Sequence, residues 1–276
     1  MAKGTISRGY LVPGLPHLVF ADKLGGWQEL KRAYSEAGAR AKQARPDVYV
    51  IYSSQWISVL GHSFQTCPAL QGLHVDENWY PLGDLPYSLK VSVSLGETMA
   101  EKAKAMQLAT KTVNFAELPI DSGTIVSQKF FNPDNSVPVG IVSCNVYANY
   151  ADSVKLGQAA AEAVSDLGLN AVAIACTGLS SRFFTKDISP GEDRISDPKD
   201  DDWNRRILEM AGSGKNKGIV DISGEFASQA MADMGFKAFS WLMGALGTPS
   251  QKANVLGYGP VWGTGAAVVE YDMASA

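Results

Sequence analysis

The chain has few of the residues from which most catalytic and metal-binding sites are built. Its 276 residues include only three histidines and three cysteines. The cysteines, Cys67, Cys144 and Cys176, are odd in number and widely spaced, which excludes a disulfide framework and a zinc motif of paired cysteines. We therefore expect a reducing cytoplasmic location, with Cys144 and Cys176 as small core residues.

Features of membrane and nucleic-acid-binding proteins are also missing. No apolar run reaches the roughly 18 residues that a bilayer span needs, and the first ten residues hold no apolar signal core. The formal net charge is −4 at pH 7, which argues against nucleic acid as the main partner. We expect neither a membrane nor a nucleic-acid partner.

Three stretches look like ligand-binding motifs, but each is incomplete. AGSGKNKG (211–218) lacks the first glycine and the final Ser or Thr of a P-loop. YGPVWGTGAA (258–267) contains no GxGxxG, and GHSFQ (61–65) lacks the second glycine of a nucleophile elbow. Surface turns are the expected structure of the first two.

What the sequence does contain is an alternation of helical and strand patterns. Residues 26–45 have helical composition and stop before Pro46, and a strand is expected at 48–53. The other expected elements are helices at 94–107, 153–168, 202–211 and 224–246 (broken near Gly235), strands at 137–145, 170–178 and 265–273, and a loop at 186–202. This alternation predicts α/β layering, in a single domain over residues 1–276.

One strand pattern ends in polar side chains. VYVIYSSQWISVLG (48–61) begins with the β-branched residues Val48, Val50 and Ile51 and then turns polar. Such strand ends commonly form the sites of α/β proteins. The central residue here is Gln55, whose amide neither titrates nor binds divalent metals well. The stretch predicts a binding platform without a reactive group.

Seven segments, read in order, resemble class III extradiol dioxygenases, the ring-cleaving enzymes. They are LVPGLPHL, DVYVIYSSQW, LPIDSGT, VPVGIVSCN, ACTGLSSRF, SDPKDDDWNRRIL and GFKAFSWLMGALG. Together they extend the resemblance from about residue 10 to about residue 270. The resemblance implies a central mixed sheet flanked by helices. It also implies a site in which two histidines and one glutamate hold Fe(II).

Most of that site has been replaced in this chain, if the resemblance is followed residue by residue. His17 matches the first iron ligand, Gln55 replaces the second histidine, and Lys237 replaces the glutamate. Ser122 replaces a histidine behind the ligands, and Ser181 replaces the acid/base histidine. The resemblance therefore implies five vestigial positions, with no catalytic residue and no metal in this chain.

The charge of a lysine at this position would oppose the binding of a metal ion. A lysine ammonium about 4 Å from a divalent ion is repelled by about 8 kcal/mol at an effective dielectric constant near 20. We expect the Lys237 ammonium to occupy the vacant metal position and to donate hydrogen bonds to Gln55 and His17, which would keep a buried polar pocket satisfied.

Two further segments, SSQWISVLGHSFQ and HVDENWYPLGDLPY, are most similar to the non-catalytic alpha subunits of the two-chain enzymes that cleave 2-aminophenol. The resemblance implies a related catalytic beta subunit that holds Fe(II) and binds the aromatic substrate, an α2β2 assembly, and a stabilising role for this chain. Residues 74–87 are expected to form an interface or lid. The alternative is a loop with Trp79 and Tyr80 in the chain's own core.

Three other functions stay open. A metal-free enzyme would use Lys237 as a Schiff-base nucleophile or general base. A regulatory module would bind an aromatic ligand in the pocket around Lys237. An active metalloenzyme would use His62, His74 or Glu225 instead.

Overall fold

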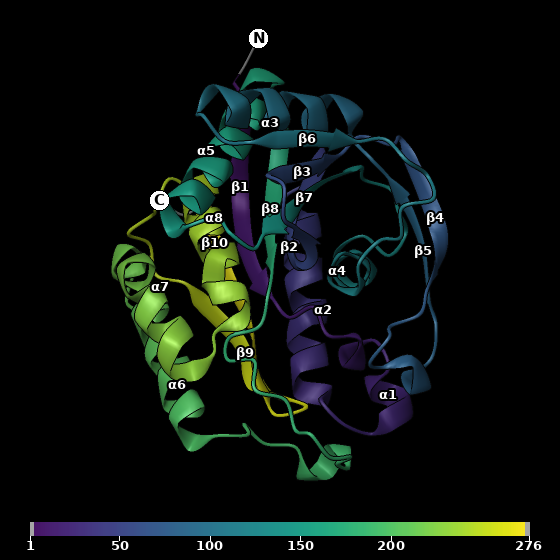
Figure 1. Cartoon of the computed structure of the whole chain (residues 1–276), viewed down its shortest axis with the longest axis vertical. Coiled ribbons are helices and arrows are strands. Elements are labelled where there is room, and N and C mark those ends of the chain that lie inside the picture. The colour runs from purple at the N-terminus through teal and green to yellow at the C-terminus, as the bar shows by residue number, and fades with distance from the viewer. Residues whose placement is uncertain (1–2, 274–276) are drawn as a thin grey trace.

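A twisted eight-stranded mixed sheet runs through the computed structural model, which describes residues 3–273 (Figure 1). In spatial order its strands are β6 (Thr110–Val113), β3 (His62–Gln65), β7 (Val139–Asn145), β2 (Val48–Ser58), β8 (Asn170–Cys176), β1 (Thr5–Val12), β10 (Thr264–Asp272) and β9 (Asn254–Val261). The central strands β7, β2, β8 and β1 pair in parallel, and β3, β10 and β9 add antiparallel pairings toward the edges.

Helices cover both faces of this sheet, because its central strands are apolar on both faces. One face packs against α3 (Val93–Ala105), α5 (Tyr150–Asp166), α6 (Pro198–Gly212), α7 (Asn216–Ala230) and α8 (Lys237–Ala245). The other packs against α2 (Gln28–Gln43), α4 (Ser122–Phe131) and the hairpin of β4 (Ala69–His74) and β5 (Leu85–Lys90), with the short α1 (Ala21–Leu24) nearby. The predicted fold, an α/β mixed sheet flanked by helices, is confirmed.

One difference from the expected elements lies in the loop predicted at 186–202. Only its first part is irregular, with a 3-10 turn η3 (Pro190–Glu192), and α6 already begins at Pro198. The Asp197 side chain accepts a hydrogen bond from the Lys199 backbone N–H, and Pro198 holds the first helical position. An aspartate cap followed by proline is a helix start, which a polar, proline-containing composition concealed.

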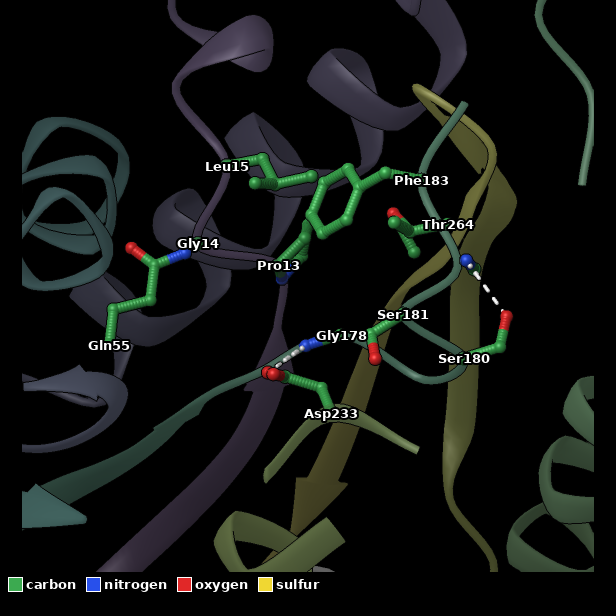
Figure 2. A pocket seen from close by; sticks show the side chains of 12 residues that line it. Pro13, Gly14, Leu15, Gln55, Gly178, Ser180, Ser181, Phe183, Asp233 and Thr264 are labelled. Atoms are coloured by element: carbon green, nitrogen blue, oxygen red, sulfur yellow. Dashed lines mark hydrogen bonds between the residues drawn. The ribbon is translucent and has the colours of Figure 1, made fainter. Parts of the chain in front are cut away.

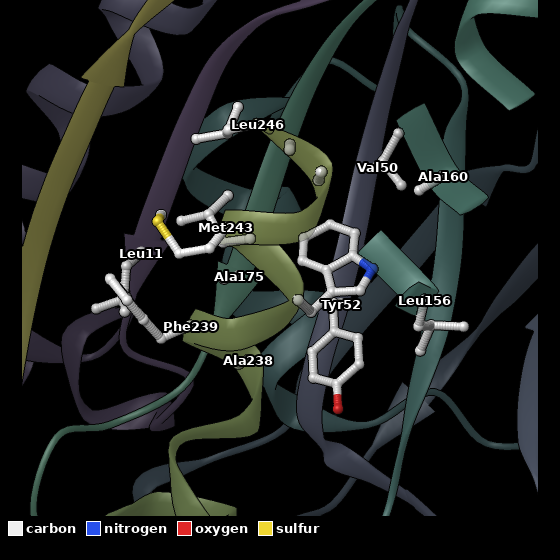
Figure 3. Packing of buried hydrophobic residues seen from close by; sticks show 14 of the residues in the cluster. Leu11, Val50, Tyr52, Leu156, Ala160, Ala175, Ala238, Phe239, Met243 and Leu246 are labelled. Atoms are coloured by element: carbon white, nitrogen blue, oxygen red, sulfur yellow. The ribbon is translucent and has the colours of Figure 1, made fainter. Parts of the chain in front are cut away.

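Helix α8 packs unusually closely against α5. A Cβ atom at Gly157 would lie 2.0 Å from the Trp241 carbonyl oxygen, and one at Gly244 would lie 2.0 Å from the Val154 carbonyl oxygen. Only glycine therefore allows this approach of the two backbones. The Trp241 ring in turn stacks on Tyr52 at 5.3 Å, in the cluster that Figure 3 shows. These contacts fix the first residue of α8, Lys237, relative to strand β2.

The cysteines and the helices bear on two expectations from the sequence. Cys67, Cys144 and Cys176 are buried and unpaired, as expected for the last two. Within residues 3–273, no helix combines the length and apolar character needed to cross a membrane.

Candidate functional site

The loop that follows β1 forms one wall of the candidate site. A Cβ atom at Gly14 would lie 2.8 Å from Cys176 Sγ and 2.9 Å from Gln55 Nε2, so a side chain there would displace Gln55. Pro16 then starts a 3-10 turn, η1 (Pro16–Leu18), which turns His17 into the interior. The glycine and proline of this loop therefore decide where both Gln55 and His17 lie.

His17 is fully buried among tryptophan rings. Its ring centroid lies 5.0 Å from that of Trp27 and 4.5 Å from that of Trp79, both in edge-to-face geometry, and 5.6 Å from that of Trp262. Neither ring nitrogen has a hydrogen-bond partner among the described residues. Burial lowers the pKa of His17 to about 4, against a smaller opposite effect of the Asp76 carboxylate. His17 is therefore a neutral imidazole at pH 7, enclosed by aromatic side chains.

Gln55 lies in an irregular end of β2, where the register against β7 shifts between Ser53 and Ile57. Its Oε1 atom accepts a hydrogen bond of 2.6 Å from the Ser122 hydroxyl group. The structure thus brings two of the five predicted positions into direct contact. Ser122 is the first residue of α4, whose cap is Asp121, and Asp121 also accepts from the Ser53 hydroxyl at 2.6 Å.

Ser181 lies on the opposite side of the pocket from this pair. Its hydroxyl group donates a 2.6 Å hydrogen bond to the Met231 carbonyl oxygen, and its backbone N–H donates to the same oxygen at 3.0 Å. This tie joins the loop after β8 to the segment that leads into α8.

The expectation for Lys237 is wrong. Its Nζ atom donates to the carbonyl oxygens of Asn145 at 3.0 Å and Val146 at 2.6 Å, and no hydrogen bond joins it to Gln55 or His17 in residues 3–273. The cause is its place at the start of α8, beside carbonyl groups at the end of β7 that β-pairing leaves open. Burial lowers the pKa of the Lys237 amine.

Replacing Lys237 by methionine should lower the free energy of unfolding by about 2 kcal/mol, because two hydrogen bonds to a charged donor are lost and two carbonyl groups lose their partner. Urea unfolding would measure this. Lys217→Met is the matched control, since Lys217 is exposed on α7; it should change stability by less than about 0.5 kcal/mol. Equal stability of the two variants would show that the carbonyl contacts contribute nothing.

Asp233 is the site residue that sequence reasoning missed. It begins a 3-10 turn, η4 (Asp233–Phe236), between α7 and α8. Its Oδ2 atom accepts three hydrogen bonds, from the Ser54 hydroxyl (2.6 Å), the Thr177 hydroxyl (2.8 Å) and the Gly178 backbone N–H (3.0 Å). The one available signal was the expected helix break near Gly235, which gave no reason to single out an aspartate.

These segments enclose a small pocket of about 60 Å³ (Figure 2). Its lining includes Pro13, Leu15, Gln55, Ser181, Phe183 and Asp233. Among residues 3–273, Asp233 is the only charged side chain in the lining, and neither His17 nor Lys237 takes part. The pocket therefore combines an apolar wall with a few polar groups, which is typical of a small-molecule site.

The three residues at the ligand positions that the resemblance gives do not together fit an iron ion. His17, Gln55 and Lys237 face different surroundings, and their donor set contains no anion while Lys237 adds a cation. Among residues 3–273, no three His, Cys, Asp or Glu side chains are grouped to hold a metal ion.

The residues of the alternative metalloenzyme do not form such a group either. Burial lowers the pKa of His62, and the Lys237 charge lowers it further, while His74 Nε2 lies 3.9 Å from Asp76 Oδ2. Glu225 is exposed on α7. These three residues therefore lie in separate surroundings.

The segment 74–87 matches each of its two interpretations in part. Trp79 packs inward on His17, Trp262 and Phe183. Its neighbour Tyr80, in the 3-10 turn η2 (Tyr80–Leu82), is 65% exposed. Trp79 is half-buried and packs on the chain's own aromatic side chains, while an interface role for the outer surface of this segment stays a prediction.

Comparison with known proteins also relates this chain to ring-opening dioxygenases. Residues 12–269 match the family described as the catalytic LigB subunit of aromatic ring-opening dioxygenase. The chain is 36% identical to the 2-aminophenol 1,6-dioxygenase alpha subunit of a Pseudomonas species over 272 residues, covering 98% of this chain and 100% of that subunit. It is 31% identical to the corresponding beta subunit over 295 residues, covering 100% and 97%.

The chain is also similar to two more distant proteins. The chain is 21% identical to 3,4-dihydroxyphenylacetate 2,3-dioxygenase of Escherichia coli over 253 residues, covering 90% of this chain and 89% of that enzyme. The crystal structure of an uncharacterised protein of Escherichia coli K12 has a TM-score of 0.64 at 14% identity, covering 96% of this chain and 99% of that one. The second likeness shows the fold alone.

Proposed function

This chain belongs to the LigB family of aromatic ring-opening dioxygenases, and from that premise we propose that it is a non-catalytic, stabilising subunit of an Fe(II)-dependent extradiol dioxygenase. The enzyme as a whole would cleave the ring of 2-aminophenol or a substituted aminophenol. Support for the substrate comes from the two relatives of this chain that are named as subunits of 2-aminophenol 1,6-dioxygenase.

The observation that carries the non-catalytic role is the direction of Lys237. Where the resemblance expects an anionic ligand, a lysine donates to the carbonyl oxygens of Asn145 and Val146. At the second ligand position, the Gln55 oxygen is occupied by Ser122. Fe(II) sites of this family need an anion and two imidazoles with open coordination positions. This chain supplies one imidazole, which is enclosed by tryptophans.

We place the iron in a related catalytic beta subunit, in an α2β2 assembly in the cytoplasm. The aromatic substrate that is cleaved would be bound by that partner. The relatives named alpha and beta subunits, both similar to this chain over nearly their whole length, support such a pairing. Three unpaired cysteines support a reducing compartment.

A metal-free enzyme that uses Lys237 has less support. The lowered pKa of the amine agrees with that idea, but the amine is bound to two carbonyl oxygens and lies outside the pocket lining. A ligand-binding role has a specific observation in its favour, namely a pocket whose charge comes from Asp233.

Metal analysis tests the proposal directly. The chain is purified alone, the related catalytic chain is purified alone, and the two are purified together, and iron content and oxygen uptake with 2-aminophenol are measured for each. We expect no iron and no oxygen uptake for this chain alone, and about one iron per pair of chains in the active complex. Stoichiometric iron with oxygen uptake in the lone chain would contradict the proposal.

A further inference from the structure

The pocket beside Gln55 holds two polar groups that the protein leaves without partners. Asp233 uses only Oδ2 to accept its three internal hydrogen bonds. Within residues 3–273, no hydrogen bond reaches Asp233 Oδ1 or leaves Gln55 Nε2, although both residues line the pocket (Figure 2). Two residues that line one small space thus carry an anionic acceptor and an amide donor without a partner among the described residues, and unpaired polar groups in such a space favour a ligand that pairs with them.

The wall between these groups is apolar. Pro13, Leu15, Phe183 and Ala266 line the pocket, and no lysine or arginine does. A carboxylate-bearing ligand would meet the Asp233 charge without a compensating cation, and like charges repel. An uncharged aromatic ring with one N–H or O–H donor and one acceptor oxygen matches both the wall and the two polar groups.

The volume of the pocket limits how such a ring can enter it. The pocket measures about 60 Å³, whereas a cavity of about 150 Å³ is known to bind benzene in another protein. Phe183 lines both this pocket and an open outer groove of about 760 Å³ that Trp79 and Trp262 also line. Its side chain is 44% exposed, and exposed side chains change rotamer on the picosecond to nanosecond scale. Because Phe183 lies between the two spaces, its outward rotation would join them and would leave room for a ring of its own size.

We infer that this pocket is a binding site for an uncharged aminophenol, with its amine donating to Asp233 Oδ1, its oxygen accepting from Gln55 Nε2, and Phe183 as the movable gate. The inference rests on the proposed function for its choice of ligand class. It adds that the subunit without iron keeps its own ligand site. No iron and no reaction are involved, because the ligand is held and released unchanged.

Calorimetric titration of the full chain with 2-aminophenol tests the inference. We expect one molecule bound per chain. Aniline, which keeps only the donor, should bind about tenfold more weakly, since one hydrogen bond is worth about one tenfold step in the equilibrium constant. The anionic 2-aminobenzoate should not bind detectably.

Single substitutions test the contribution of each side chain to binding. Asp233→Asn keeps an oxygen for the three internal donors and places an NH2 group where Oδ1 stood, so 2-aminophenol should bind at least about tenfold more weakly. Asp202→Asn on α6 is the matched control, since Asp202 is exposed and lines neither the pocket nor the groove, and it should leave binding unchanged. Phe183→Ala should strengthen binding because it removes the gate, whereas Phe184→Ala should not, because Phe184 does not line the pocket.

A second measurement uses the complex. Anaerobic titration of the complex with 2-aminophenol should give two sites per pair of chains, and one site when this chain carries Asp233→Asn. The inference is overturned if 2-aminophenol binds neither the native chain nor Phe183→Ala at millimolar concentration, or if Asp233→Asn leaves binding unchanged. Iron and oxygen uptake measured on the same samples distinguish this failure from that of the proposed function, because an iron-free chain without a ligand site would overturn only the inference.

Discussion

Replacing Glu270 by glutamine is expected to lower the free energy of unfolding by about 3 kcal/mol. Glu270 on β10 is 1% exposed. Its Oε1 atom accepts from Arg8 and Tyr10, each at 2.8 Å, and its Oε2 atom accepts from Arg40 at 2.8 Å and Asn254 at 3.3 Å. Glutamine would remove the negative charge and turn an NH2 group toward these donors, which leaves buried donors unpaired.

A solvent-exposed ion pair in the same region provides the control. Arg40 also binds Glu36 at 2.6 Å, one helical turn away, where Glu36 is about half exposed. Because surface pairs contribute little, Glu36→Gln should change stability by less than about 0.5 kcal/mol. Urea unfolding of both variants measures the difference. If Glu270→Gln were as mild as Glu36→Gln, the buried charge cluster would not be holding β1 and β10 together.

The second large effect is on the pH dependence of stability. Between about pH 7.5 and about pH 4.5, we expect His17 to reduce the free energy of unfolding by about 2.5 kcal/mol. Burial lowers the pKa of His17 in the folded protein to about 4, from the usual 6.5. Below pH 6.5 the unfolded chain binds a proton at His17 that the folded chain does not bind, so the free energy of unfolding falls as the pH falls. The loss levels off below the folded pKa of about 4.

The variant His17→Phe isolates this contribution, because a phenyl ring packs among the same tryptophans and does not titrate. Unfolding is measured at several pH values for both proteins, and the difference between them removes the contributions of carboxylates and of His62. We expect the wild type to lose about 2.5 kcal/mol more than the variant over this range. Parallel pH profiles would show that His17 is accessible to protons and that the tryptophans do not seal it.

Both predictions concern the strand and loop that build the site. Arg8 and Tyr10 hold β1 against β10 through Glu270, and β1 leads directly into the loop that carries Gly14 and His17. The buried charge and the aromatic enclosure therefore set the position of the pocket wall.

The layered fold could be predicted because its signal is local. The strands β7 and β8 are short apolar runs between turn residues, and α2 stops just before Pro46. Apolar runs and proline determine the structure of residues close to them in the chain, so the sequence shows both the signal and the segment that it affects. The late helix break near Gly235 was visible for the same reason.

The candidate site could be predicted only in part. That Gln55, Ser122 and Ser181 carry no group that titrates near neutral pH follows from the residue types themselves. Where Lys237 points does not follow, because it depends on how closely Gly157 and Gly244 let α8 approach α5 and on which carbonyl groups β7 leaves open. These are contacts between residues more than 80 positions apart in the chain.

The sequence by itself determined the α/β class, the family resemblance and the absence of an anionic ligand at Lys237, because each depends on residue identity and short-range order. Only the tertiary structure decided that tryptophans enclose His17, that Lys237 turns to β7, and that Asp233 supplies the charge of the pocket. Packing places such groups by the shapes of distant neighbours, and hydrogen bonds then form with whatever partners packing has brought within reach.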